Sequence, residues 1–247
     1  MDNDAKLPFT NHLEELRKRL IVCFIAVGIC FVLCYGFSRK LFEILMGPLI
    51  SVMPPGDKLI YTGLPDAFFT YLKVALLAGV LLAVPVIFYQ LWMFVMPGLY
   101  ENERRIVLPA VVLSSIFFAG GALFGYFIVF PFGFKFFLSF SSDFIRPMPS
   151  IREYLSFASK LLFAFGVVFE MPLFIVILAK LGVVTVAQLQ MYRKYVIVLF
   201  FVFAAILTPP DVVTQIMMAA PLMLLYELSI IAAKIISKKK AEESEPE

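Results

Sequence analysis

The sequence has few of the residues that carry metal or redox chemistry. It contains one histidine, His12, and three cysteines in 247 residues. Cys23, Cys30 and Cys34 lie in one apolar stretch at spacings of seven and four residues, and a straight helix cannot bridge its own cysteines at such spacings without distortion. We therefore expect the thiols to pack as small apolar groups. We expect neither a metal site nor a cofactor.

Charged residues are also scarce. They make up 16% of the chain, whereas hydrophobic residues make up 62%; soluble domains have about 25% charged residues. Several continuous runs of about 18 or more nearly uncharged residues predict transmembrane helices. The runs are continuously apolar, whereas the strands of a membrane barrel alternate between apolar and polar residues. The predicted fold class is therefore all-α, a polytopic membrane protein.

Common catalytic motifs are absent. The sequence has no G-x-x-x-x-G-K-S/T, no H-E-x-x-H and no G-x-S-x-G. It therefore gives no support for an ATPase or for a protease that carries one of these motifs. We predict a protein that is not an enzyme.

The apolar runs predict six spans in a single transmembrane domain, residues 20–233. An amphipathic segment, residues 1–19, precedes this domain, and a charged, disordered tail, residues 234–247, follows it. The predicted spans are Leu20–Phe37, Phe68–Met96, Ile106–Phe134, Leu155–Leu181, Tyr195–Leu207 and Val212–Ala233. The fifth span offers about 20 Å of helix against a hydrocarbon core of about 30 Å. We expect the bilayer to become thinner beside it.

Lysine and arginine predict the orientation, because cytoplasmic loops carry an excess of both. Thirteen of the 21 basic residues lie on one side, in the two termini, in the loop after the second span and in the connector between Lys180 and Lys194. The other eight are spread over the longer loops of the opposite side. We predict that both termini are cytoplasmic.

Prolines and glycines mark expected bends and close contacts. Pro48 lies in an amphipathic piece that follows the first span and is expected to pack as a cap. Pro85 predicts a kink in the second span, and Pro209 with Pro210 ends the fifth. Three glycines of the third span permit close approach of a neighbouring helix: Gly120, Gly121 and Gly125.

Three acidic residues lie at the predicted cytoplasmic face, each with an ordinary structural explanation beside a functional one. Glu14 and Glu15 precede Lys18 and Arg19 by four residues, so ion pairs on a helix surface account for them. Glu103 lies in the charged loop between the second and third spans, where an acid favours the positive end of a helix.

Two further acidic residues lie elsewhere. Glu170 has nine non-ionisable residues on either side and falls near the middle of the bilayer, where a charge costs about 2.5–3.5 kcal/mol. Residues of this kind are functional candidates. Asp211 is explained as a helix N-cap, but with Thr208 and Gln215 it also forms a polar cluster at one membrane edge.

Four motifs occur in order along the chain: H-L-x-E-L-R-K-R-L from His12, F-V-x-P-x-L-Y-x-x-E-R-R from Phe94, F-G-x-x-F-E-x-P at 165–172 and T-P-P-D-x-x-x-Q at 208–215. The chain resembles the TatC family, the membrane core of the twin-arginine protein translocase. The resemblance covers residues from about His12 to Ala233. It implies a multi-pass protein of the bacterial inner membrane that binds the twin-arginine signal peptides of folded export substrates.

The resemblance also implies roles for particular residues. Glu15 and Glu103 would meet the two arginines of the signal peptide. Arg17, Arg19, Arg104 and Arg105 would orient these acids, and Phe94 and Leu99 would accept the apolar part of the peptide. Thr208, Asp211 and Gln215 would form the docking edge for single-span TatA- and TatB-like subunits. Glu170 would polarise or hydrate a concave face.

The same resemblance implies that export is driven by the proton-motive force in an oligomeric complex within the lipid bilayer, with no nucleic acid as partner. Two other classes of function stay open on the residues alone. A proton-coupled transporter of small solutes would use Glu170 as a relay, although no internal repeat is visible. An intramembrane enzyme would need a nucleophile and a base that the sequence does not display.

Overall fold

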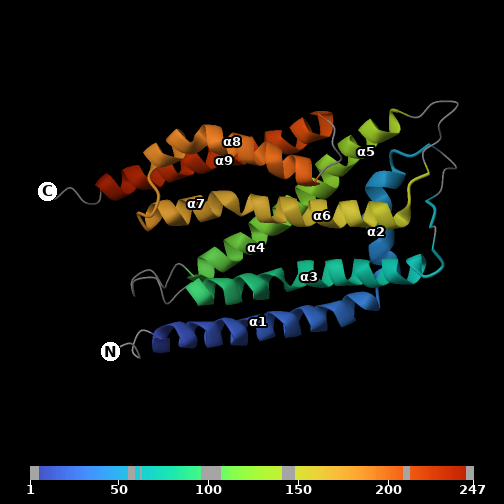
Figure 1. The fold of residues 1–247 in the computed structure, drawn as a ribbon, viewed down its shortest axis with the longest axis horizontal. Coiled ribbons are helices and arrows are strands. Elements are labelled where there is room, and N and C mark those ends of the chain that lie inside the picture. The colour runs from blue at the N-terminus through green and yellow to red at the C-terminus, as the bar shows by residue number, and fades with distance from the viewer. Residues whose placement is uncertain are drawn as a thin grey trace. The chain divides into compact units, whose positions relative to one another are not determined.

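The structure is a computed structural model that describes residues 6–54, 59–61, 63–95, 107–140, 148–207 and 212–242, with side chains from His12 to Ile236. These ranges are helical apart from turns and one isolated parallel bridge between Ile60 and Ser150. The helices are α1 (Lys6–Tyr35), α2 (Ser38–Ile50), α3 (Asp66–Val95), α4 (Val107–Phe124), the π-helix η3 (Gly125–Val129), α5 (Phe130–Leu138), α6 (Ile151–Phe169), α7 (Met171–Lys180), α8 (Val186–Leu207) and α9 (Val212–Glu242) (Figure 1).

Six helical stretches of the described chain are long and apolar enough to cross a membrane. They are His12–Tyr35, Asp66–Val95, Val107–Leu138, Ile151–Lys180, Val186–Leu207 and Val212–Ile236. The predicted class, an all-α polytopic membrane protein with six spans, is confirmed.

The contacts of the chain group into two compact units. Unit 1 comprises Met1–Gly47 and Tyr61–Ile116, and unit 2 comprises Pro48–Ile60 and Phe117–Glu247. The sequence predicted one transmembrane domain from 20 to 233. Each unit is described below by itself.

Unit 1 is built on the pairing of α1 with α3. The two helices lie side by side (Figure 1), and their backbones come close at Gly79. A Cβ atom at Gly79 would lie 2.8 Å from the backbone N of Phe31. Only glycine fits this contact without a shift of α1, so the small residue sets the distance between the helices.

In unit 2 the helices α4 and α6 come close at two glycines. A Cβ atom at Gly121 would lie 2.3 Å from the backbone O of Phe165, and one at Gly166 would lie 2.7 Å from the ring of Phe118. The predicted role of the third-span glycines is confirmed for Gly121. It is wrong for Gly120, where an added Cβ would meet nothing within 4 Å.

Helix α2 confirms the amphipathic piece after the first span and contains Pro48. It buries Leu45, Met46 and Leu49 and exposes Ile44. The helix α3 continues on both sides of Pro85. The kink predicted there stays a prediction.

The predicted start of the fifth span at Tyr195 is wrong for the helix, because α8 begins at Val186. Thr185 and Gln188 form a capping box that starts it. The Thr185 backbone N–H donates to Gln188 Oε1 at 2.9 Å, and the Gln188 backbone N–H donates to Thr185 Oγ1 at 3.3 Å. The helix is 22 residues long, about 33 Å, and is among the stretches that are long and apolar enough to cross a membrane, so the shortness behind the expected bilayer thinning is not found.

Two predicted spans contain interruptions. The third passes through the π-helix η3, and Pro131 follows in the first turn of α5. The fourth breaks at Glu170, which ends α6 and precedes α7, with Pro172 in the first turn of α7. A proline lacks the N–H that a continuous helix needs and its ring clashes with the preceding turn.

The predicted disordered tail from Lys234 is wrong for its first part, since α9 continues to Glu242. Lysine, alanine and glutamate favour helix, so the last span extends beyond its apolar part. Pro209 and Pro210, predicted to end the fifth span, lie outside the described residues, although α8 does end at Leu207.

Candidate functional site

In unit 1 a polar cluster lies where α1 begins and α3 ends. The imidazole of His12 stacks on the ring of Phe94, with centroids 4.2 Å apart and planes 20° apart. Two turns further along α1, Arg19 Nη1 donates to Gln90 Oε1 of α3 at 3.4 Å. These contacts hold the first turns of α1 against the last turns of α3.

Glu15 lies between these two contacts. Arg19 Nε donates to Glu15 Oε1 at 3.0 Å, and Arg19 Nη2 pairs with the same oxygen. The other oxygen, Oε2, lies 4.0 Å from His12 Nδ1. The Glu15 side chain is 31% exposed and that of Arg19 is 19% exposed, so this ion pair is largely shielded from water.

Glu14 has a different environment, one residue away. Its carboxylate pairs with Lys18 Nζ at 2.9 Å, and both side chains are exposed. The predicted ion pairs at four-residue spacing are thus confirmed for both acids, but Glu14 faces water, whereas Glu15 pairs with an arginine that also contacts α3. Arg17 is also exposed.

The loop that carries Glu103 lies outside the described residues, as do Leu99, Arg104 and Arg105. Its two anchor points are described and both belong to unit 1, because α3 ends at Val95 and α4 begins at Val107. The buried Trp92 and Ser114 join these helices through a hydrogen bond of 3.2 Å from Trp92 Nε1 to Ser114 Oγ.

Sequence reasoning missed the contacts of two members of this cluster and of the neighbouring Trp92. His12 was considered only as the lone histidine and as the first residue of a motif, and Gln90 and Trp92 fell within a predicted apolar span. Gln90 is an uncharged polar residue in the last turns of that span, on the side of the membrane where Glu15 was expected. A polar residue at this position of the span indicates a hydrogen-bond partner for a charged residue of α1, and that residue is Arg19.

A second polar position lies in unit 2. Glu170 is 4% exposed, and its backbone links α6 to α7. The family resemblance implies that this carboxyl group polarises or hydrates a concave face. In the described structure its side chain is buried in the chain, and its role stays a prediction.

The predicted docking edge is described only at Gln215, because Thr208 and Asp211 lie outside the described residues. Gln215 Nε2 donates to the Phe201 backbone O at 2.9 Å and so joins α9 to α8. At the other end of this pair, Tyr226 Oη donates to the Leu189 backbone O at 2.8 Å and Arg193 Nη2 lies 2.5 Å from Glu227 Oε2. Both ends of the α8–α9 pair are thereby fixed.

Among the described residues, no group of three or more histidine, cysteine, aspartate or glutamate side chains is placed to hold a metal ion. The three cysteines, all on α1, are free thiols.

The family model for "Sec-independent protein translocase protein (TatC)" matches residues 11–221. The chain belongs to the TatC family. It is therefore a component of the twin-arginine protein translocase and a multi-pass bacterial membrane protein. This membership sets aside the alternative of a small-solute transporter, and it places the chain in a family of translocase components and not of known enzymes.

Similar TatC proteins cover almost the whole chain. The Sec-independent protein translocase protein TatC of Desulforapulum autotrophicum is 61% identical over 98% of this chain and 90% of its own length. That of Magnetococcus marinus is 48% identical over 100% of this chain and 91% of its own length. A crystal structure described as the twin arginine translocase receptor TatC has 43% identity and a TM-score of 0.82, over 92% of this chain and 99% of its own.

Proposed function

We propose that this TatC-family protein is the receptor for twin-arginine signal peptides, with Glu15 and Glu103 as the carboxylates that bind the two arginines. The name of the related crystal structure describes that protein as a translocase receptor. The single observation that carries the proposal here is the environment of Glu15.

Glu15 is held in a geometry that suits a guanidinium group. Its Oε1 already binds the fork of Arg19, whereas among the described residues only His12 Nδ1 approaches Oε2, at 4.0 Å. A carboxylate accepts several hydrogen bonds, so Oε2 provides the position for an incoming arginine. Charge-assisted pairing of this kind is strong and is often bidentate.

The second acid, Glu103, belongs to the loop whose described anchor points, Val95 and Val107, lie in the same unit as Glu15, and this common anchoring supports a joint site. Two arginines then meet two carboxylates. Arg17, Arg104 and Arg105 limit repulsion between the acids and orient them. Phe94, beside His12, and Leu99 accept the apolar stretch that follows the arginines.

The remaining assignments belong to the same proposal. Both termini and this receptor site face the cytoplasm, in agreement with the excess of basic residues on that side. Single-span TatA- and TatB-like subunits dock along α8 and α9 near Gln215, Thr208 and Asp211. The translocase is oligomeric in the inner membrane, and the proton-motive force drives export.

The experiment measures photo-crosslinking of a signal peptide to the full chain in detergent. We expect Glu15→Gln and Glu103→Gln each to reduce binding about tenfold to 150-fold, because a hydrogen bond to a charged group contributes about 1.5–3 kcal/mol. A peptide with two lysines in place of the arginines should bind as weakly as the twin-arginine peptide binds to the double variant.

Glu14→Gln is the matched control, since it removes the same charge one residue away from the cluster. It should leave crosslinking close to the wild-type level. Equal losses for Glu14→Gln and Glu15→Gln would mean that only net charge matters, and undiminished crosslinking in the double variant would overturn the receptor site.

A further inference from the structure

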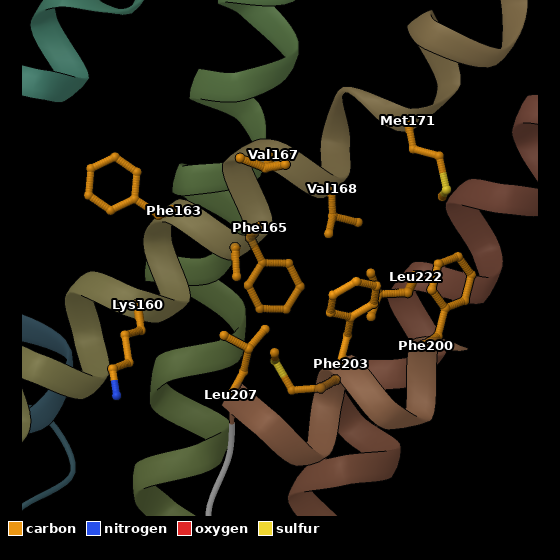
Figure 2. A pocket seen from close by; sticks show the side chains of 12 residues that line it. Lys160, Phe163, Phe165, Val167, Val168, Met171, Phe200, Phe203, Leu207 and Leu222 are labelled. Carbon is orange, nitrogen blue, oxygen red and sulfur yellow. The ribbon is translucent and has the colours of Figure 1, made fainter. Parts of the chain in front are cut away.

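Unit 2 contains an apolar pocket of about 500 Å³ among α6, α7, α8 and α9 (Figure 2). Its floor is formed by Phe165, Phe200, Met218 and Leu222, which are all buried. Its lining also includes Val167 and Phe203, which are 62% and 50% exposed. The pocket is therefore closed at its base and open on the surface of a membrane-embedded bundle.

One cation belongs to this lining. Lys160 of α6 is exposed and is the only charged residue of the pocket. Figure 2 shows its side chain at the opposite end of the pocket from Met171. Among the residues that the structure describes, no carboxylate forms an ion pair with Lys160.

The position of Lys160 along its span fits the depth of a lipid headgroup. The stretch Ile151–Lys180 has 30 residues, about 45 Å of helix against a hydrocarbon core of about 30 Å, so about 7 Å extends beyond the core at each end. Lys160 is about 14 Å from Ile151 and hence about 6 Å inside the hydrocarbon boundary. A lysine at this depth can extend its ammonium group to the lipid phosphates.

We propose that the pocket binds one acyl chain of an anionic phospholipid, with the lipid phosphate against Lys160 Nζ. The end of the pocket with Lys160 lies toward one bilayer surface, and the end with Met171 lies about 16 Å further along the α6–α7 span, past its middle and still within the hydrocarbon core. A phospholipid has the same order of charged and apolar parts. The proposal does not depend on the receptor site in unit 1.

The size of the pocket argues against a transmembrane helix as the occupant. A helix with its side chains is about 10–12 Å wide, so 500 Å³ holds only about 5 Å of its length, roughly one turn. An acyl chain is much thinner and reaches the buried floor. The pocket volume also lies within the range of about 300–1,000 Å³ that is typical of small-molecule sites.

The test is native mass spectrometry of the full chain released from nanodiscs that contain phosphatidylglycerol, phosphatidylethanolamine and diacylglycerol with the same acyl chains. We expect the wild type to retain one phosphatidylglycerol in preference to the other two lipids. Lys160→Gln should reduce this retention about fivefold, the effect of one basic residue near a membrane surface. Lys160→Arg should preserve it.

Two further variants separate charge from space. Lys180→Gln removes a lysine of the same span that does not line the pocket, so retention should stay at the wild-type level. Ala164→Phe fills the pocket and should reduce retention of every lipid. Lys160→Gln and Ala164→Phe should both still bind a twin-arginine peptide, which shows that the variants are folded.

Three results would overturn the proposal. The first is equal retention of the charged and uncharged lipids. The second is equal retention of phosphatidylglycerol by Lys160→Gln and Lys180→Gln. The third is crosslinking of a single-span partner subunit to a probe at Phe203 with displacement of the lipid. That result would identify the pocket as a helix-docking site.

Discussion

Replacing Gly121 with alanine tests the crossing of α4 and α6. The new methyl group would lie 2.3 Å from the Phe165 backbone O and 2.8 Å from Phe169 Cβ. Non-bonded atoms pack at about 3.5–4 Å, so the helices must separate by about 1 Å or bend. Overpacking of this kind costs about 1–3 kcal/mol.

Gly120→Ala is the matched control, because its methyl group would meet nothing within 4 Å. Both substitutions gain the same helix propensity, about 1 kcal/mol in favour of alanine. The difference between the two variants therefore isolates the contact with α6. At about 2–4 °C per kcal/mol, Gly121→Ala should lose the folded state about 2–12 °C below Gly120→Ala.

The assay heats each variant in detergent and measures the folded monomer that remains by size-exclusion chromatography. If Gly121→Ala and Gly120→Ala melt at the same temperature, the close approach of α4 to α6 does not limit stability. The reasoning from the glycine contact would then be wrong. Gly121→Val, which introduces a larger side chain, should lower the melting temperature further than Gly121→Ala does.

Three other predictions use the same stability assay. Gly79→Ala should destabilise unit 1 by about 1–3 kcal/mol, whereas Gly28→Ala on α1, with open space around it, should not; equal melting would contradict the close packing of α1 on α3. Ser114→Ala should cost about 1 kcal/mol and shift the emission of the single tryptophan to shorter wavelength, and an unchanged spectrum would refute the hydrogen bond. Arg193→Gln and Glu227→Gln should each cost less than about 1 kcal/mol, because both side chains are half exposed; a double variant with additive losses would show that the two residues act independently.

The number and type of the spans were predictable because long apolar runs have one stable arrangement in a bilayer. The interruptions at Glu170 and in η3 were not predicted, since composition does not distinguish a continuous helix from a broken one. Pro172 and Pro131 carried that signal. The start of α8 was missed because Gln188 was counted as a loop residue and its capping box with Thr185 was overlooked.

The site was predictable in part. The spacing of Glu15 and Arg19 predicted their ion pair, which depends only on the helical repeat. The approach of Gln90 and of the stacked pair His12 and Phe94 depends on how α1 packs against α3. The packing of α1 on α3 is set by the contact between Gly79 and Phe31, about four turns away from Glu15. The sequence near Glu15 therefore does not predict it.

The polar cluster around Glu15 has a consequence for the order of synthesis. Every described member, from His12 to Phe94, lies in α1 or α3, and the contacts that hold them join only these two helices. A ribosome completes both helices before it begins α6. The Glu15 environment can therefore assemble in the membrane before the helices around the apolar pocket of unit 2 are synthesised, so the proposed receptor site does not need the later half of the bundle in order to form.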